Sequence, residues 1–382
     1  MNIAVPTLGC DGGLSGISRY TNRILAQLAT SPEVGDLEIF SLSGEERFFA
    51  PASDRSHTTP VATRYRSPLA SILWHQAVLP RVSRRADVLF LPAGNRRLPL
   101  YSAIPTVGVV HDLSSLHVPG KYGLTRDAYI KRVLPVLIRR LTQIITVSES
   151  SRRDIVTYCG IAPERVTVIP LGVDAEQFAP APAAGDRARI REQLGVDAPY
   201  FLYVSRIEHP GKNHVRLIEA FARSIARTGA PHHLILAGPD RERAAEVHQA
   251  AAGSGMRDRI HFTGFLPDDL LPSLYRASAA LVFPSLYEGF GLPIVEAMAC
   301  GVPVACGRIS SLPEVAGDAA LYFDPQEVEP LAQRLTELVE RPELGRELAA
   351  RSLARSRLFR WSEVARRTLD VMRRAVSPVR PD

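Results

Sequence analysis

The sequence has few cysteines, few lysines and no long apolar run. Its four cysteines are too few for a disulfide scaffold and lack the spacing of metal ligands. No apolar run approaches the roughly 18 residues that a membrane-spanning helix needs, and no basic residue precedes Arg19, so we expect no secretory leader. These absences predict a reduced, cytoplasmic protein. The 382 residues, 46% of them hydrophobic and 23% charged, fit a globular protein of two or three domains.

Positive charge is unevenly distributed. The chain has 46 basic and 40 acidic residues, a net charge of +6, and residues 1–180 carry 20 Lys and Arg against 15 Asp and Glu. Nearly all of this charge is arginine, since only Lys121, Lys131 and Lys212 are lysines. Such a bias is compatible with binding to nucleic acid, with binding to an anionic membrane, or with a genome base composition that favours arginine. The lack of interleaved aromatic and basic residues disfavours nucleic acid.

Short apolar, β-branched runs alternate with helical patterns along the whole chain. We expect strands at 2–6, 36–40, 87–91, 106–110, 143–147, 165–169, 200–204, 233–237, 260–263, 280–283 and 302–305. We expect helices at 17–29, 69–84, 124–141, 150–158, 213–227, 241–252, 270–277 and 292–299. A Pro/Ala/Gly-rich stretch at 179–185 interrupts the alternation. The pattern predicts an α/β chain with two parallel, doubly wound sheets, in domains 1–178 and 179–358. Such sheets bind ligands beyond the carboxyl ends of their strands.

The strongest local signal is the segment 284–303, which runs from a strand end into a helix. Gly289 and Gly291 let backbone N–H groups at the helix start approach an anion or a hydroxyl-rich ligand. Glu288 lies in the loop and Glu296 in the helix, and both carboxylates are natural acceptors for sugar hydroxyls. We therefore expect a ligand site above this helix.

A second signal is the segment 205–213, directly after the strand at 200–204. It contains Arg206, a bidentate donor, and Lys212, a compact point charge. Positive charge that is prearranged for the phosphates of a ligand can be supplied by a divalent metal or by a cation pair. The chain contains no Asp-x-Asp metal motif, which favours the cation pair over a metal. The alternative is two solvated surface cations.

These segments resemble glycosyltransferase family 4, whose hallmark is two glutamates separated by seven residues, here Glu288 and Glu296. The resemblance spans nearly the whole chain and includes the segments 168–174 and 310–320. It implies the GT-B fold, with two facing Rossmann-like domains, an interdomain cleft, and a C-terminal helix at 359–382 that crosses back to the N-terminal domain. The family usually shows Gly-Arg and a lysine five residues later, whereas here Ser205 replaces the glycine and the spacing is six.

The resemblance also implies roles for individual residues. The first glutamate, Glu288, contacts the donor sugar, and the second, Glu296, holds the ribose. Arg206 and Lys212 hold the phosphates. The other donor-binding positions that the resemblance suggests are Gly13, Gly16, Gly264, Phe265, Gly289, Phe290, Gly291 and Leu292.

The N-terminal half adds weaker signals. The glycine-rich loop 9–16 follows the first strand, but its spacing does not match Gly-x-Gly-x-x-Gly, which disfavours a dehydrogenase. The family resemblance places this loop over the donor phosphates, with Arg19 on the acceptor side. His111 ends the strand at 106–110, where family members carry a histidine against the donor sugar. Asp112, also on the acceptor side, is expected to orient His111 or to cap the next segment.

Two basic segments, 69–84 with Trp74 and 124–141, have an amphipathic pattern. Such helices either lie on an anionic bilayer or present a solvated basic face. We expect a peripheral position on the inner face of the cytoplasmic membrane as one of these alternatives.

By resemblance, the chain is expected to be a retaining, metal-independent glycosyltransferase without a cofactor. Its expected substrates are a nucleotide-sugar, with GDP-mannose as the leading candidate, and a saccharide acceptor carried on polyprenyl diphosphate. The expected pathway is bacterial exopolysaccharide or lipopolysaccharide synthesis. A GT-B phosphorylase, a sugar-nucleotide epimerase and a non-catalytic nucleotide-sugar-binding subunit are the alternatives.

Overall fold

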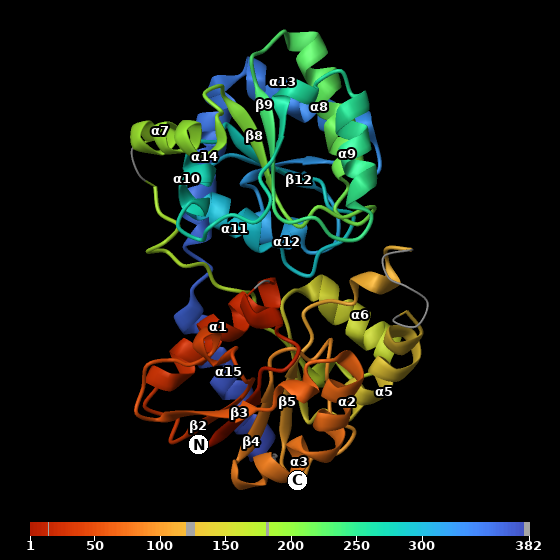
Figure 1. Cartoon of the computed structure of the whole chain (residues 1–382), viewed down its shortest axis with the longest axis vertical. Coiled ribbons are helices and arrows are strands. Elements are labelled where there is room, and N and C mark those ends of the chain that lie inside the picture. Colours follow the sequence, from red (N-terminus) through yellow and green to blue (C-terminus); the bar gives the residue numbers. More distant parts are fainter. Residues whose placement is uncertain (14, 120–126, 181–182, 378–382) are drawn as a thin grey trace. The chain divides into compact units, whose positions relative to one another are not determined.

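The structure, a computed structural model, describes residues 1–13, 15–119, 127–180 and 183–377. The chain divides into two compact units (Figure 1). The first contains Met1–Leu116, Tyr122–Gly172 and Arg360–Asp382, and the second contains His117–Lys121 and Val173–Phe359. None of the described helices is both long enough and apolar enough to cross a bilayer.

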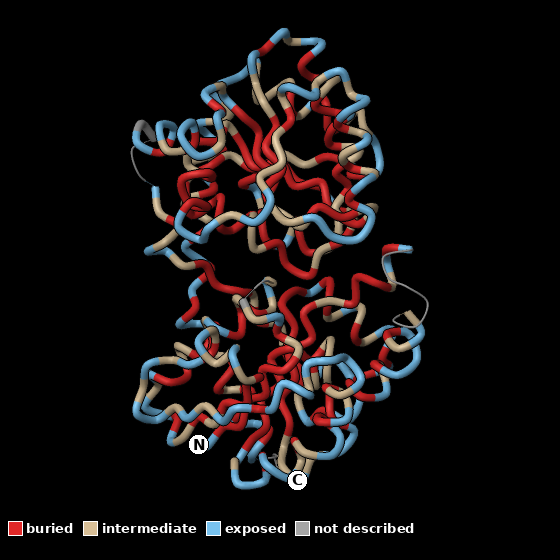
Figure 2. The backbone as a smooth tube through the Cα atoms, viewed as in Figure 1, coloured by how far each residue is buried: buried red, intermediate tan, exposed pale blue. Residues whose placement is uncertain are grey.

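The first unit is built on a seven-stranded parallel sheet in the order β3-β2-β1-β4-β5-β6-β7. Its strands are β1 (Ile3–Pro6), β2 (Leu37–Leu42), β3 (Ser56–Val61), β4 (Val88–Leu91), β5 (Thr106–Val109), β6 (Gln143–Thr146) and β7 (Val166–Val168). The strands β1, β4 and β5 are buried along their whole length, as Figure 2 shows for the centre of the unit. Burial on both faces explains why these strands are continuous apolar runs in the sequence.

Helices cover both faces of this sheet. They are α1 (Gly16–Thr30), α2 (Pro68–Ala77), α3 (Leu79–Val82), α5 (Leu134–Arg139), α6 (Glu149–Cys159) and α15 (Trp361–Val376), with a π-helix at Tyr129–Val133. α1 and α15 pack together on one face, while α2, α5 and α6 contribute to the core on the other (Figure 1). Although α15 comes last in the chain, it belongs to this unit: Arg367 donates to the carbonyl of Val168 at 2.7 Å.

The second unit contains a six-stranded parallel sheet in the order β10-β9-β8-β11-β12-β13. Its strands are β8 (Tyr200–Val204), β9 (His233–Ala237), β10 (Ile260–Phe262), β11 (Ala280–Phe283), β12 (Val304–Gly307) and β13 (Ala320–Phe323). Its helices are α7 (Ala183–Leu194), α8 (His214–Thr228), α9 (Ala244–Gly253), α10 (Leu271–Arg276), α11 (Leu292–Ala299), α12 (Leu312–Ala316), α13 (Val328–Glu340) and α14 (Pro342–Ser356). α8, α9 and α13 lie on one side of the sheet and α7, α10, α11 and α14 on the other (Figure 1).

Short 3-10 turns complete both units. They lie at Asp11–Gly13, Glu46–Phe48, Thr63–Tyr65, Ser83–Arg85, Ser114–Leu116, Pro163–Arg165 and Arg257–Arg259. The predicted α/β class with two parallel, doubly wound sheets is confirmed.

Two strands escaped the sequence prediction. β3 is an edge strand whose residues are mostly exposed or half-buried, so it lacks an apolar run, and it contains Pro60. A proline is tolerated there because an edge strand leaves part of its backbone unpaired. β13 has only four residues and is half-buried at its centre. The predicted strand at 302–305 is displaced, because β12 begins at Val304.

Two predicted helices were wrong in extent. The helix predicted at 69–84 is broken into α2 and α3, with Pro80 at the start of α3, because proline has no backbone N–H to continue the hydrogen bonding of a helix. The helix predicted at 124–141 begins outside the described residues. Its described part changes from the π-helix at Tyr129–Val133 to α5, which has Pro135 in its first turn.

The first strand of each unit marks the point at which the strand order reverses. β1 lies between β2 and β4, and β8 lies between β9 and β11. In open α/β sheets, ligands bind beyond the carboxyl ends of the strands at this position. The loops after β8 and β11 are therefore the first place to look for a site.

Candidate functional site

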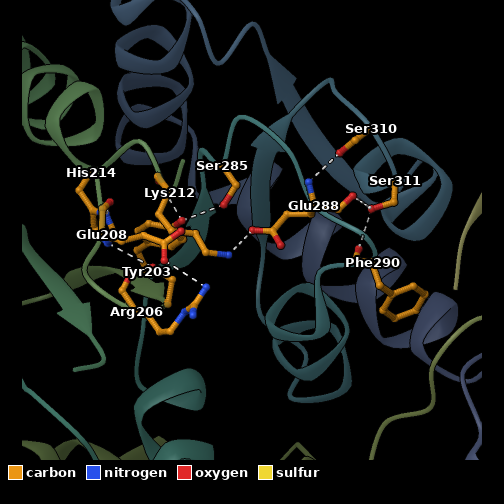
Figure 3. A network of polar contacts seen from close by, with 11 residues as sticks. Tyr203, Arg206, Glu208, Lys212, His214, Ser285, Glu288, Phe290, Ser310 and Ser311 are labelled. Carbon is orange, nitrogen blue, oxygen red and sulfur yellow. Dashed lines mark hydrogen bonds and ion pairs between the residues drawn. The ribbon is translucent and has the colours of Figure 1, made fainter. Parts of the chain in front are cut away.

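The loops after β8 and β11 are joined to each other. Gly211, in the loop after β8, accepts a hydrogen bond at 3.0 Å from the backbone N–H of Leu286, in the loop after β11. The two strands are neighbours in the sheet, so their loops leave the same edge side by side. This arrangement brings together Arg206, Lys212 and Glu288, which were predicted from separate segments (Figure 3).

Both predicted phosphate-binding cations are paired with carboxylates. Lys212 Nζ lies 2.6 Å from Glu288 Oε1, and each of these side chains is 15% exposed. Arg206 Nη2 lies 3.0 Å from Glu208 Oε2, and the Arg206 side chain is 39% exposed. The site thus presents two cations whose charges are balanced by two anions. An incoming diphosphate can compete with Glu288 for Lys212, because both are anionic oxygen acceptors.

A buried tyrosine, Tyr203, holds the backbone of Lys212 by a hydrogen bond. The Tyr203 hydroxyl donates to the Lys212 carbonyl at 2.9 Å and lies 2.9 Å from Ser285 Oγ (Figure 3). Burial raises the pKa of Tyr203 above its ordinary value, so this hydroxyl stays protonated. Asn213, at φ +63°, donates to the carbonyl of Pro284 at 3.0 Å. These bonds fix the backbone at Lys212 and at Asn213, the residue that follows it.

The loop that carries Glu288 is held by two serines that follow β12. Ser310 Oγ accepts the backbone N–H of Glu288 at 3.0 Å, and the Ser311 hydroxyl bonds to the carbonyls of Glu288 and Phe290 at 2.9 and 3.2 Å. The ring of Phe290 packs against Phe359, so its side chain is part of the core. These serines were not singled out in the sequence, although they lie in a segment that carries the family resemblance.

The start of α11 has the geometry expected from its glycines. Gly291 precedes the helix at φ +97°, where a side chain is strained, and a Cβ there would lie 3.1 Å from Leu312. Gly289 is buried in the same loop, and Leu292 is the first residue of the helix. Backbone N–H groups at this terminus suit an anion or a sugar hydroxyl.

Glu296 lies on the buried side of α11. It is 2% exposed, and its Oε2 accepts a hydrogen bond at 2.8 Å from the hydroxyl of Tyr275 on α10. Tyr275 was not predicted as part of the site. Its hydroxyl fixes one carboxylate oxygen, which orients Glu296 within α11.

The loop after β9 is bridged to the loop after β8 on one side and to the loop after β10 on the other. Gly238 has φ +146°, and a Cβ at this position would lie 2.1 Å from the carbonyl oxygen of Ser205, so only glycine fits. Gly238 forms an isolated bridge with Gly264, one of the predicted donor-binding positions. Phe265, also predicted, is 62% exposed at this edge. Gly238 was missed because no motif marks it, although it directly follows a predicted strand.

His111 belongs to the first unit and is buried at the carboxyl end of β5. Burial lowers the pKa of His111 to about 4, so the ring is neutral at pH 7. Its Nε2 lies 2.9 Å from the carbonyl oxygen of Pro92, and a carbonyl accepts only, so Nε2 carries the proton. Nδ1 therefore bears the lone pair, which suits it to accept a hydrogen bond from a hydroxyl. The ring meets the edge of Tyr20 at 4.9 Å.

The other predicted residues of the first unit lie around the ends of β1 and β5. Gly13 ends the 3-10 turn after β1, and Gly16 begins α1, whose first turn contains Arg19. Asp112 accepts the backbone N–H of Ser114 at 2.9 Å, which fits the predicted capping role.

Arg96 was missed by the sequence prediction. It donates to the carbonyl of Gly9 at 2.7 Å and pairs with Asp11, so it holds the glycine-rich loop from the loop after β4. The sequence feature that could have indicated Arg96 is its position a few residues beyond the strand predicted at 87–91. Within the described part of the chain, no three His, Cys, Asp or Glu side chains cluster as potential metal ligands.

Comparisons with known proteins cover both halves of the chain. The family "Glycosyltransferase Family 4" matches residues 14–177, and the family "Glycosyl transferases group 1" matches residues 186–354. The O-antigen chain mannosyltransferase B of Escherichia coli is 31% identical over 371 residues, which cover 94% of this chain and 95% of that protein. The serotype-specific mannosyltransferase WbdA of Escherichia coli is 33% identical over 266 residues, which cover 68% of this chain and 32% of that protein.

The fold also matches a solved structure. The crystal structure of Anabaena Alr3699/HepE in complex with UDP-glucose has a TM-score of 0.78 and 22% identity, and the match covers 98% of this chain and 99% of that one. The two parallel sheets, the family matches and the full-length relative agree with one another. The chain is therefore a glycosyltransferase of family 4 with the GT-B fold.

Proposed function

We propose that the chain transfers a mannosyl residue from GDP-mannose to a lipid-linked saccharide, with retention of anomeric configuration and without a metal ion. The observation that carries the proposal is the meeting of Arg206 and Lys212 with Glu288 at the carboxyl ends of β8 and β11. Two cations suit the diphosphate of a nucleotide-sugar, and the carboxylate suits the hydroxyls of its sugar.

Mannose is supported by the relatives. Escherichia coli mannosyltransferases align with this chain at 31% and 33% identity, one of them over nearly its full length. That relative acts on the O-antigen chain, which supports a bacterial surface polysaccharide as the product here.

The proposed reaction is attack on the same face of the sugar from which the phosphate departs. The acceptor oxygen bonds to the anomeric carbon, the bond from that carbon to the β-phosphate oxygen breaks, and the acceptor proton passes to the leaving phosphate. Arg206 and Lys212 stabilise the charge that grows on the phosphate. Glu288 and the neutral Nδ1 of His111 are assigned to the sugar hydroxyls, and Glu296 to the ribose.

Metal independence follows from this assignment. The cation pair occupies the role that a divalent ion has in other nucleotide-sugar enzymes, so the reaction needs no metal and no cofactor. Phe265, exposed beside Gly264, is assigned to the nucleotide base, against which an aromatic ring can stack.

A lipid-borne acceptor at an anionic membrane is supported by the first unit. Residues 55–111 contain eight arginines and a single acidic residue, Asp87. The same stretch exposes Leu69 by 76% and Leu73 by 64% on α2, and Tyr101 by 70%. Exposed apolar side chains among arginines suit the surface of an anionic bilayer. Trp74, in contrast, is 2% exposed and packs against Phe40, so it is not available to lipid.

The test is a panel of nucleotide-sugars incubated with the purified protein, first without and then with a polyprenyl-diphosphate-linked mannoside. We expect GDP-mannose to be hydrolysed fastest and the acceptor to gain an α-linked mannose. Preference for a uridine nucleotide would overturn the donor assignment, and an inverted linkage would overturn retention. Sedimentation with anionic and neutral vesicles tests the membrane: equal binding to both would overturn the lipid assignment.

A further inference from the structure

Glu208 is a buried carboxylate that the proposed mechanism does not use. It lies in the loop between β8 and α8 and is 5% exposed. Removing a carboxylate from water is costly unless it is paired with a cation and hydrogen-bonded. The partner of Glu208 therefore shows what this carboxylate does.

Glu208 faces the proposed phosphate-binding arginine. Its Oε2 lies 3.0 Å from Arg206 Nη2, and Oε1 has no hydrogen-bond partner among the described residues. The neighbouring cation, Lys212, is paired with Glu288 at 2.6 Å. Arg206 thus supplies the ion pair that compensates the buried charge of Glu208 (Figure 3).

The backbone of Glu208 is fixed more firmly than the side chain of Arg206. His214 is fully buried, with Nδ1 3.3 Å from the Glu208 carbonyl and Nε2 3.1 Å from Ser205 Oγ. Burial lowers the pKa of His214 to about 3, so the ring stays neutral and bridges the two ends of this turn. Ile207, also buried, donates its backbone N–H to the Pro239 carbonyl at 3.0 Å. The Arg206 side chain, in contrast, is long and 39% exposed.

We propose that Glu208 is a positioning residue that anchors the Arg206 guanidinium for the leaving phosphate. This inference rests on the proposed function of the same site. A guanidinium has five N–H donors, so it can keep its bond to Glu208 while it binds a phosphate oxygen. The carboxylate also lowers the positive potential that a bound diphosphate meets. Glu208 therefore favours the transition state through orientation and weakens binding of the ground state through its charge.

Loss of Glu208 is thus expected to lower kcat without weakening GDP binding. A merely structural role would weaken both. Replacing Glu208 by glutamine keeps its size but removes its charge. The Glu208→Gln variant is expected to bind GDP as tightly as the wild type or more tightly. Its kcat is expected to fall about tenfold to hundredfold, because misplacement of a positioned group by about an ångström costs that much.

The experiment measures kcat, the KM for the donor and GDP affinity for the wild type, Glu208→Gln, Arg206→Ala and the double variant. Glu219→Gln is the matched control, since Glu219 forms an exposed pair with Arg223 on α8. Because Glu208 acts through Arg206, Glu208→Gln should not lower kcat further in the Arg206→Ala background. If Arg206→Ala fails to fold, Arg206→Met serves as the background, because methionine keeps much of the side-chain volume but has no charge for Glu208 to position.

Three results overturn the proposal. The first is a Glu208→Gln variant with kcat within twofold of the wild type. The second is a parallel loss of kcat, GDP affinity and thermal stability, which shows a structural role. The third is an additive loss in the double variant. In each of these cases the wild type remains active and the proposed function stands, whereas a folded wild type that binds no nucleoside diphosphate overturns both.

Discussion

Replacement of Lys212 by alanine tests the proposed phosphate site most severely. Lys212 is held 2.6 Å from Glu288, and its side chain is 15% exposed, so its charge is only partly screened by water. A unit charge about 4 Å from a phosphate oxygen is worth roughly 4 kcal/mol at an effective dielectric constant of about 20. Part of this is already gained in the ground state, because the bound diphosphate is charged before the bond breaks.

The interaction that Lys212 gains only in the transition state is about 3 kcal/mol, so its loss is expected to lower kcat roughly a hundredfold. The assay is release of GDP from GDP-mannose with acceptor present. Lys131→Ala is the matched control, because Lys131 is 54% exposed and forms only a surface pair with Asp127 at 3.6 Å. We expect that control to retain full activity.

Stability separates a chemical effect from a structural one. The alanine variant leaves Glu288 without its cation, which is expected to destabilise the protein by about 2 kcal/mol, less than for a fully buried pair. Glu288→Gln removes the opposite partner and gives a second measure of the pair. If folded Lys212→Ala kept a kcat within threefold of the wild type, the assignment of Lys212 to the leaving phosphate would be refuted.

Three further predictions concern other parts of the chain. Burial lowers the pKa of His75 to about 4, below its unfolded value near 6.5, so the stability that neutral His75 contributes is complete above pH 6.5 and is lost as the pH falls toward 4. In urea unfolding, His75→Gln should therefore lose less stability than the wild type between pH 7 and 5. Equal losses in the two proteins would contradict this. Gly172→Ala should lower the free energy of unfolding by about 1–3 kcal/mol, because a Cβ there would lie 2.6 Å from the backbone nitrogen of Trp361. Calorimetry should therefore show a lower thermal unfolding midpoint, and an unchanged midpoint would argue against this packing. EDTA should leave turnover unchanged in an assay with GDP-mannose, and a loss restored by Mg²⁺ or Mn²⁺ would show that the reaction needs a metal.

The fold class was accessible from the sequence because buried parallel strands are recognisable as apolar runs. β1, β4 and β5 are buried throughout, and each was predicted within a residue or two. The edge strand β3 was not, because an exposed strand lacks the apolar pattern on which the prediction depends. Proline explains the broken helix at 69–84, since Pro80 divides a segment whose periodicity predicts one helix.

The site was only partly accessible, for a different reason. Motif spacing predicted Arg206, Lys212 and Glu288 as residues of one site, and the structure places them together in one unit. The motif spacing did not indicate that Glu288 pairs with Lys212, because an ion pair between residues 76 positions apart depends on the sheet order. Glu208 and Tyr275 were missed for the same reason. Their importance lies in burial and in contacts, neither of which a single sequence displays.

The most direct test of the central claim is a crystal structure of the protein with GDP bound. We expect the β-phosphate within about 3 Å of both Arg206 and Lys212, with the bond from Lys212 to Glu288 broken or shared. Glu208 is expected to keep its contact with Arg206. A diphosphate bound away from the ends of β8 and β11, with the pair of Lys212 and Glu288 intact, would show that these cations do not form the phosphate site.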